Sequence, residues 1–185
     1  MAALEHFRVA ILATDGVEEV ELTEPAKSLG QASAKTDVIS LQPGRIQALR
    51  HIDKSNQIPV DLVVDQANPA HYDALLLPGG AINADQMRMH PNVQQFIRAM
   101  ASANKPMAVI CHAPWELISA NLARGRTLTS WPTIQDDLRN AGANWVDQEV
   151  VIDGNLVTSR GPQDLMPFIR EMIRLFTRSM QATTP

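Results

Sequence analysis

The chain of 185 residues lacks most of the features that mark specialised protein classes. Its only cysteine, Cys111, cannot form an internal disulfide, which excludes a disulfide-stapled extracellular scaffold. No apolar stretch reaches the roughly 18 residues that a membrane helix needs, and residues 1–16 lack the pattern of a signal peptide. The net charge of −4 leaves no broad cationic surface for nucleic acid or an anionic membrane. We therefore expect a cytoplasmic protein that has neither a membrane nor nucleic acid as a partner.

Motifs for common cofactors and metals are missing as well. The chain has no GxxxxGK[ST] phosphate loop, no GxGxxG dinucleotide motif, no CxxC pair and no HExxH pair. The histidines other than His112 are scattered along the chain, at His6, His51, His71 and His90. We therefore expect no cofactor and no bound metal.

The sequence instead shows short apolar runs that alternate with segments of helical spacing. The runs that predict strands lie at 7–13, 36–41, 60–64, 74–77, 106–110 and 127–130. Helices are expected at 17–29, 93–103, 114–122, 133–141 and 163–180, a hairpin at 149–159, and an irregular excursion at 42–57. The alternation predicts one α/β domain over residues 1–180, with a mostly parallel sheet covered on both faces, and a frayed tail at 181–185.

Three predicted loops with unusual chemistry leave the carboxyl ends of these strands, at 14–21, 78–85 and 111–115. In open α/β sheets, ligands bind at the carboxyl ends of the strands. The fold should therefore bring these three distant loops together at one edge of the sheet.

Cys111 follows the apolar strand 107–110 and comes shortly before Pro114, which suits the first turn of a helix. A nucleophile on such a turn is held out of the sheet, and a nearby helix N-terminus would lower the pKa of its thiol. The alternative is a buried cysteine that acts as a small hydrophobe. The neighbouring His112 favours a reactive cysteine, for which it could be the general base or the cation that stabilises a thiolate. A plain surface histidine is the alternative for His112.

The other two loops offer partners for Cys111. Gly79 and Gly80 permit a close backbone approach and could form an oxyanion hole, although a plain turn is the alternative. Glu21 lies between two apolar residues, so partial desolvation would help it to retain its proton. Glu18 and Glu19 are interpreted as ordinary partners of the helix dipole. The three tryptophans could line a pocket but are interpreted as packing residues: Trp115, Trp131 and Trp145.

Several motifs, spread in order over almost the whole chain, together resemble the ThiJ/PfpI superfamily. They are DGVEEVEL at 15–22, YDALLLPGG at 72–80, KPMAVICHAP at 105–114, LTSWP at 128–132, NWVD at 144–147 and DGNLVTSR at 153–160. Within the superfamily the chain is most similar to the branch of PfpI-like intracellular proteases and protein deglycases. This resemblance implies a flavodoxin-like three-layer α/β sandwich, similar to class I glutamine amidotransferases.

The resemblance also assigns roles to individual residues. It implies that Cys111 is the nucleophile, that His112 is its dyad partner, and that the buried Glu21 hydrogen-bonds the sulfur. The amides of Gly80 and His112 would donate to an oxyanion. In PfpI-like relatives an acidic residue from a neighbouring subunit orients the histidine, and Asp85 is the matching candidate here. The resemblance thus implies that the site needs a homo-oligomer, a homodimer or homohexamer.

Two positions depart from the family pattern. Ala113 replaces the glycine that usually follows the Cys-His pair, which would cost strain if its φ were positive. Val109 stands where amidotransferases carry glycine, so amidotransfer is set aside.

The function expected from the resemblance is that of a cofactor-free, cysteine-dependent hydrolase of stress defence. Its substrates would be free methylglyoxal or glyoxal, or the adducts of these aldehydes on proteins. One alternative is an intracellular cysteine peptidase that uses the same residues. Others are a non-catalytic redox sensor or chaperone-like stress protein based on an oxidisable Cys111, and a structural domain with a vestigial site.

Overall fold

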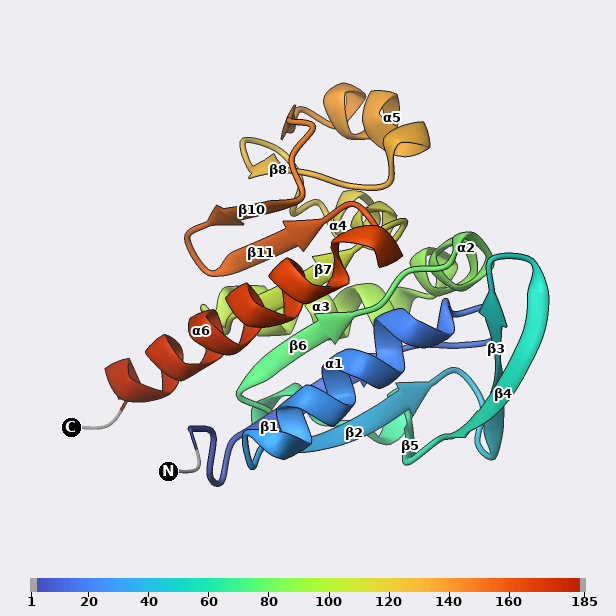
Figure 1. The fold of residues 1–185 in the computed structure, drawn as a ribbon, viewed down its shortest axis with the longest axis vertical. Helices are drawn as coiled ribbons and strands as arrows, with labels where there is room; N and C mark the ends of the chain where they lie inside the picture. Colours follow the sequence, from blue (N-terminus) through green and yellow to red (C-terminus); the bar gives the residue numbers. More distant parts are fainter. Residues whose placement is uncertain (1–2, 184–185) are drawn as a thin grey trace.

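A computed structural model describes residues 3–183 and is built around one seven-stranded sheet with the order β10-β11-β7-β6-β1-β2-β5 (Figure 1). Its strands are β1 (Arg8–Leu12), β2 (Lys35–Ser40), β5 (Leu62–Val63), β6 (Ala74–Leu77), β7 (Met107–Ile110), β10 (Val150–Asp153) and β11 (Leu156–Ser159). All neighbouring strands pair in parallel except the β10–β11 hairpin, which is antiparallel. The interior strand β1 places Ile11 opposite Val38 on β2 and Leu76 on β6. The predicted mostly parallel sheet and terminal hairpin are confirmed.

Helices cover both faces of this sheet, so the fold is the predicted flavodoxin-like three-layer sandwich. The helices are α1 (Glu19–Gln31), α2 (Ala81–Met89), α3 (Pro91–Ser102), α4 (Pro114–Ser119), α5 (Gln135–Asn140) and α6 (Leu165–Thr183). Figure 1 shows α1 and α6 on one face and α2, α3 and α4 on the other. In β1, Val9 and Ile11 join the core under α1 and α6, whereas Ala10 and Leu12 join the opposite core. This two-sided burial explains why the strands are continuous apolar runs.

The hairpin of β3 (Arg45–Arg50) and β4 (Asp53–Pro59) corrects the predicted irregular excursion at 42–57. Its two strands form a separate sheet beside the start of α1 (Figure 1), and Leu49 makes one isolated parallel bridge to Glu18. Of its residues only Ile46 and Ala48 are buried apolar side chains. A mostly exposed hairpin carries little alternation of apolar residues, so its strands left no clear signal in the sequence.

Other short elements differ from prediction for similar reasons. Helix α2 was not predicted, because only Asn83, Ala84 and Met87 of its residues are buried. The predicted strand at 127–130 is the short β8 (Thr127–Leu128), which pairs with β9 (Asn144–Trp145) in a separate two-stranded sheet. Short 3-10 turns complete the described chain at Val64–Gln66, Pro69–His71, Pro132–Ile134 and Pro162–Asp164.

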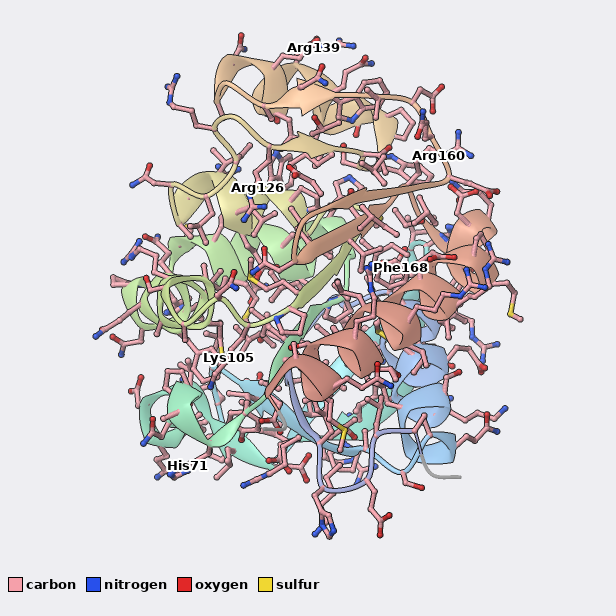
Figure 2. The ribbon with its side chains drawn as sticks, turned by 90° about the vertical axis from the view of Figure 1, so that its left-hand side faces the viewer. His71, Lys105, Arg126, Arg139, Arg160 and Phe168 are labelled. Atoms are coloured by element: carbon pink, nitrogen blue, oxygen red, sulfur yellow. The ribbon has the colours of Figure 1, made fainter. Side chains whose placement is uncertain are left out.

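The C-terminal helix α6 runs to Thr183, beyond the predicted end at Met180. Its inner side packs on the sheet through buried residues at four-residue spacing, Phe168, Met172 and Phe176, of which Phe168 is labelled in Figure 2. Residues 181–183 of the tail that was predicted to fray are helical in the structure, and 184–185 lie outside the described residues. None of the helices within residues 3–183 is both long and apolar enough to cross a membrane.

Candidate active site

Cys111 lies on the turn between β7 and α4, as expected, and its backbone adopts a strained conformation with a φ of 64°. Positive φ is unfavourable for any residue with a Cβ and persists only where the surroundings enforce it. Here the Cys111 amide donates to the carbonyl of Ser159 (3.0 Å), and the Cys111 carbonyl accepts from the amide of Trp131 (2.9 Å). These two bonds pin the residue in its strained geometry.

Ala113 adds no strain to this turn. Its φ of −57° and ψ of −25° lie in the right-handed helical region, where a methyl group is well tolerated. The positive φ that would have penalised alanine falls on Cys111 instead. The departure from the family pattern is therefore sterically neutral at Ala113.

Gly79 and Gly80 form a close backbone contact with the other two loops. A Cβ at Gly79 would overlap both the Glu21 carboxyl and the Cβ of Cys111. Gly80 has a φ of 94°, and a Cβ there would overlap the carbonyl of Gly16. Both positions thus need glycine, and the three loops meet at one edge of the sheet as predicted.

His112 contacts the cysteine beside it. Its Nδ1 lies 3.2 Å from the Cys111 Sγ, and its ring lies 5.9 Å from the Trp131 ring at an angle of 26°. The ring of Trp115 packs against it at 5.4 Å. Burial lowers the pKa of His112, which favours the neutral imidazole and hence a general base over a stabilising cation. Interpreting Trp115 and Trp131 as ordinary packing residues was incomplete, because both hold the imidazole in place.

Glu21 is wholly buried at the end of this cluster. Its Oε2 accepts a hydrogen bond from the Gly79 amide (2.9 Å), and the carboxyl also lies in hydrogen-bonding contact with the Cys111 thiol, as expected. Burial raises the pKa of Glu21 to about 8, and the Gly79 amide only partly opposes this rise. The carboxyl therefore retains its proton near neutral pH, as the sequence suggested.

The expected lowering of the Cys111 pKa is wrong. The side chain is only 5% exposed, and burial, followed by the charge of Glu21, raises the pKa of Cys111 well above its ordinary value. The backbone amides of Gly80 and His112 lower the pKa of Cys111, but by less than burial and Glu21 raise it. Helix α4, whose N-terminus was expected to lower this pKa, has only six residues. Because Cys111 and Glu21 repel each other when both are ionised, the pair holds one negative charge far more readily than two.

A small cavity of about 120 Å³ opens beside the sulfur. Its lining residues are Glu18, Glu21, His51, Gly80, Ala81, Cys111, His112, Trp131 and Pro162. Of these, His51 and Pro162 had no signal in the sequence, because the fold alone brings their segments to the cavity. Asp85 is exposed on α2 and does not line the cavity of its own chain. Within residues 3–183, no group of three or more His, Cys, Asp or Glu side chains is arranged to hold a metal ion.

Glu18 and Glu19 were interpreted as ordinary partners of the helix dipole, and the structure corrects this, because both also bond to the β3–β4 hairpin. Both are buried. Glu18 Oε2 accepts the backbone N–H of His51 (2.9 Å), and His51 itself has a φ of 57° at the tip of the β3–β4 hairpin. Glu18 thereby holds the hairpin tip at the mouth of the cavity.

Glu19 fastens the same hairpin from the first turn of α1. Its carboxylate accepts from Arg50 Nη2 (2.8 Å) and from the Asn56 amide (3.0 Å). The Ser55 hydroxyl and the Arg50 guanidinium hold the pKa of Glu19 at about 2. Both strands of the hairpin are thus bonded to Glu19, and the sequence gave no sign of these long-range bonds.

Comparisons with known proteins identify the family of this chain. The model of the DJ-1/PfpI family matches residues 7–175. The chain is 43% identical to a deglycase of Pyrococcus abyssi, over 91% of this chain and 98% of that protein. It is 37% identical to a putative cysteine protease of Bacillus subtilis, over 91% and 97% of the two chains. The crystal structure of Drosophila melanogaster DJ-1beta superposes with a TM-score of 0.83 at 28% identity, over 95% of this chain and 96% of that one. The chain belongs to the DJ-1/PfpI family.

Proposed function

We propose that this protein is a PfpI-type deglycase, a cofactor-free hydrolase that removes methylglyoxal or glyoxal adducts from proteins or converts the free aldehydes. The observation that carries the proposal is the arrangement at Cys111. Its sulfur faces a small cavity, 3.2 Å from the Nδ1 of His112 and beside the buried carboxyl of Glu21. The proposed setting is stress defence in the cytoplasm.

In the proposed reaction, His112 takes the thiol proton and the sulfur of Cys111 attacks the aldehyde-derived carbon of the adduct. The C–N bond breaks, and the amine leaves with a proton, so that a hemithioacetal remains on the sulfur. Glu21 and His112 then move the proton of this carbon to the neighbouring carbonyl carbon, and the hydroxyl proton passes to the oxygen of that carbonyl, which yields a thioester of a hydroxy acid. Water cleaves the thioester, releases a hydroxy acid such as lactate, and restores the thiol.

The protein environment supports these steps. The amides of Gly80 and His112 lie against the sulfur, where they would donate to an oxyanion that develops on the attacked carbon. The raised pKa of Glu21, about 8, suits a group that gives and takes protons near neutral pH. The cavity of about 120 Å³ beside the sulfur is open to solvent, so a small carbonyl compound can reach Cys111.

Peptide hydrolysis is the second candidate, favoured by the relative named a putative cysteine protease. The same Cys111 and His112 would then form an acyl-enzyme. A redox sensor is less well supported, because a buried thiol with a raised pKa is slow to oxidise.

The proposal is tested with the purified protein, methylglyoxal-treated N-acetyl-lysine, free methylglyoxal and a fluorogenic peptide. We expect loss of the adduct with release of lactate, and a drop of roughly a thousandfold or more in the Cys111→Ala variant. Glu116→Gln is the matched control, because Glu116 is equally buried but does not line the cavity, and it should retain activity. Adduct turnover that survives Cys111→Ala would refute the proposal, and turnover of the peptide alone would favour the peptidase.

We also propose that the active unit is a homo-oligomer, a homodimer or homohexamer, in which Asp85 of a neighbouring subunit reaches His112. In one chain, nothing acidic apart from Glu18 and Glu21 lines the described cavity, and Asp85 is exposed on the adjacent helix α2. A carboxylate brought to His112 would orient the imidazole, as the third member of a catalytic triad does.

A further inference from the structure

Asn83 is a wholly buried polar residue of α2 that the proposed reaction does not use and that does not line the cavity. Its Oδ1 accepts the amide N–H of Thr14 at 2.8 Å. Its Nδ2 donates to the carbonyls of Pro78 and Gly79, both at 3.0 Å. Asn83 thus bonds only to backbone groups of the two loops that face Cys111.

The two carbonyls belong to consecutive peptide units whose opposite ends serve the site. All peptide bonds of the described chain are trans, so within each unit the C=O and the N–H point in opposite directions. The N–H paired with the Pro78 carbonyl is that of Gly79, which donates to Glu21 Oε2 at 2.9 Å. The N–H paired with the Gly79 carbonyl is that of Gly80, which lies against the Cys111 sulfur. The side-chain amide of Asn83 therefore fixes the direction of the Gly79 and Gly80 N–H groups by bonding to the carbonyl at the opposite end of each peptide unit.

The Gly79–Gly80 pair needs such a constraint because glycine rotates more freely than any other residue. Both glycines are required for the close approach to Glu21, Cys111 and Gly16, so no side chain of their own can hold them. The Glu18 amide also donates to the Gly79 carbonyl, but at the longer distance of 3.3 Å. We propose that Asn83 is a positioning residue that aims the Gly79 amide at Glu21 and the Gly80 amide at the sulfur of Cys111. The predicted effect of Asn83 on turnover rests on the proposed function, whereas its predicted effect on the pKa of the Cys111 thiol does not.

The test is Asn83→Asp, which keeps the shape of the side chain and the acceptor for Thr14. A carboxyl buried against two carbonyl oxygens retains its proton, so it can donate to at most one of them where Asn83 donates to both. We expect kcat for adduct removal to fall by roughly a hundredfold to a thousandfold, as when one oxyanion donor is lost, with KM changed by less than about threefold. We also expect the pH midpoint for alkylation of Cys111 by iodoacetamide to rise by about one unit or more.

The alkylation measurement separates this inference from the proposed function, since it needs no substrate. A wild-type protein that removes no adduct would refute the proposed function, while the midpoint in Asn83→Asp would still decide the role of Asn83. The matched control is Asn92→Asp, because Asn92 is exposed on α3 and its Nδ2 donates to Asp65 at 2.6 Å, away from the cavity. We expect its kcat and midpoint to equal those of the wild type.

A purely structural Asn83 would give a different result. Asn83→Asp would then melt at a lower temperature, but its folded fraction would keep the wild-type kcat and alkylation midpoint, and that outcome would overturn the proposal. If Asn83→Asp does not fold, Asn83→Ser carries the test, because its shorter hydroxyl can donate to at most one of the two carbonyls. We expect smaller changes of the same sign in Asn83→Ser, and a wild-type midpoint in that variant would equally overturn the proposal.

Discussion

Glu21 makes the stability of the protein depend on pH. The pKa of Glu21 is about 8 in the folded protein and 4.5 in the ordinary exposed state, so between these values the folded state holds a proton that the unfolded state releases. The contribution of Glu21 to the free energy of unfolding should therefore be highest below about pH 4.5, fall as the pH rises, and level off above about pH 8. At roughly 1.4 kcal/mol per unit of pKa shift, the loss is at most about 5 kcal/mol.

The Glu21→Gln variant isolates this contribution, because glutamine fills the same space and does not titrate. We expect the wild type to lose stability relative to Glu21→Gln between pH 5 and pH 8, as measured by urea unfolding. Glu24→Gln is the control, since Glu24 lies on the same helix but is half exposed, and its pH profile should follow that of the wild type. A constant difference between wild type and Glu21→Gln across this range would contradict the assignment.

At the scale of elements, the attachment of the β3–β4 hairpin to α1 depends on Glu19. Glu19→Ala removes the bonds to Arg50 and to the Asn56 amide. We expect amide hydrogen exchange over 45–59 to accelerate by at least about tenfold, because one hydrogen bond to a charged group contributes roughly 1.5 kcal/mol. Exchange in the central strands β1 and β6 should change much less.

The wild-type hairpin should also loosen in acid. The pKa of Glu19 is depressed to about 2, so the stability that its carboxylate provides is present above about pH 4.5 and is lost as the pH falls toward 2. Glu24→Ala is the control for the exchange measurement, because Glu24 makes only a 3.8 Å ion pair with Lys27. Equal exchange over 45–59 in Glu19→Ala and Glu24→Ala would show that Glu19 does not hold the hairpin.

At the scale of the whole molecule, the shared site proposed for an oligomer can be tested by mixing two inactive variants. Cys111→Ala lacks the proposed nucleophile, and Asp85→Asn lacks the carboxylate that a neighbour is proposed to supply. In a mixed dimer, one of the two sites has an intact Cys111 and an intact Asp85 from the other chain. Random mixing of equal amounts should therefore restore about a quarter of wild-type activity.

The surface of α2 is suited to such an assembly, because Ile82 (52% exposed) and Met89 (67% exposed) flank Asp85 on this helix. Analytical ultracentrifugation would give the size of the wild-type assembly. A monomer, or an Asp85→Asn variant with full activity, would rule out the shared site. Activity that is not restored on mixing, although mixed oligomers form, would place Asp85 in the same chain or outside the site.

The sequence by itself determined the architecture and the chemical core of the site. Buried strands between two helical layers must be continuous apolar runs, so β1, β6 and β7 were visible as local patterns. The rule that strand ends face the ligand crevice then placed Cys111, Glu21 and Gly80 together without any coordinates. The β3–β4 hairpin and α2 were not predicted from the sequence, because elements that bury few apolar residues leave a weak periodic signal.

Only the tertiary structure decided the electrostatics and the supports of the site. The sequence suggested a lowered pKa for Cys111, but burial among distant residues raises it, and burial depends on packing that no local pattern records. Glu18 and Glu19 looked like simple helix-dipole partners until their bonds to the hairpin were seen. Asn83 bonds to Thr14, a residue 69 positions away in the chain, and such contacts exist only once the chain has folded.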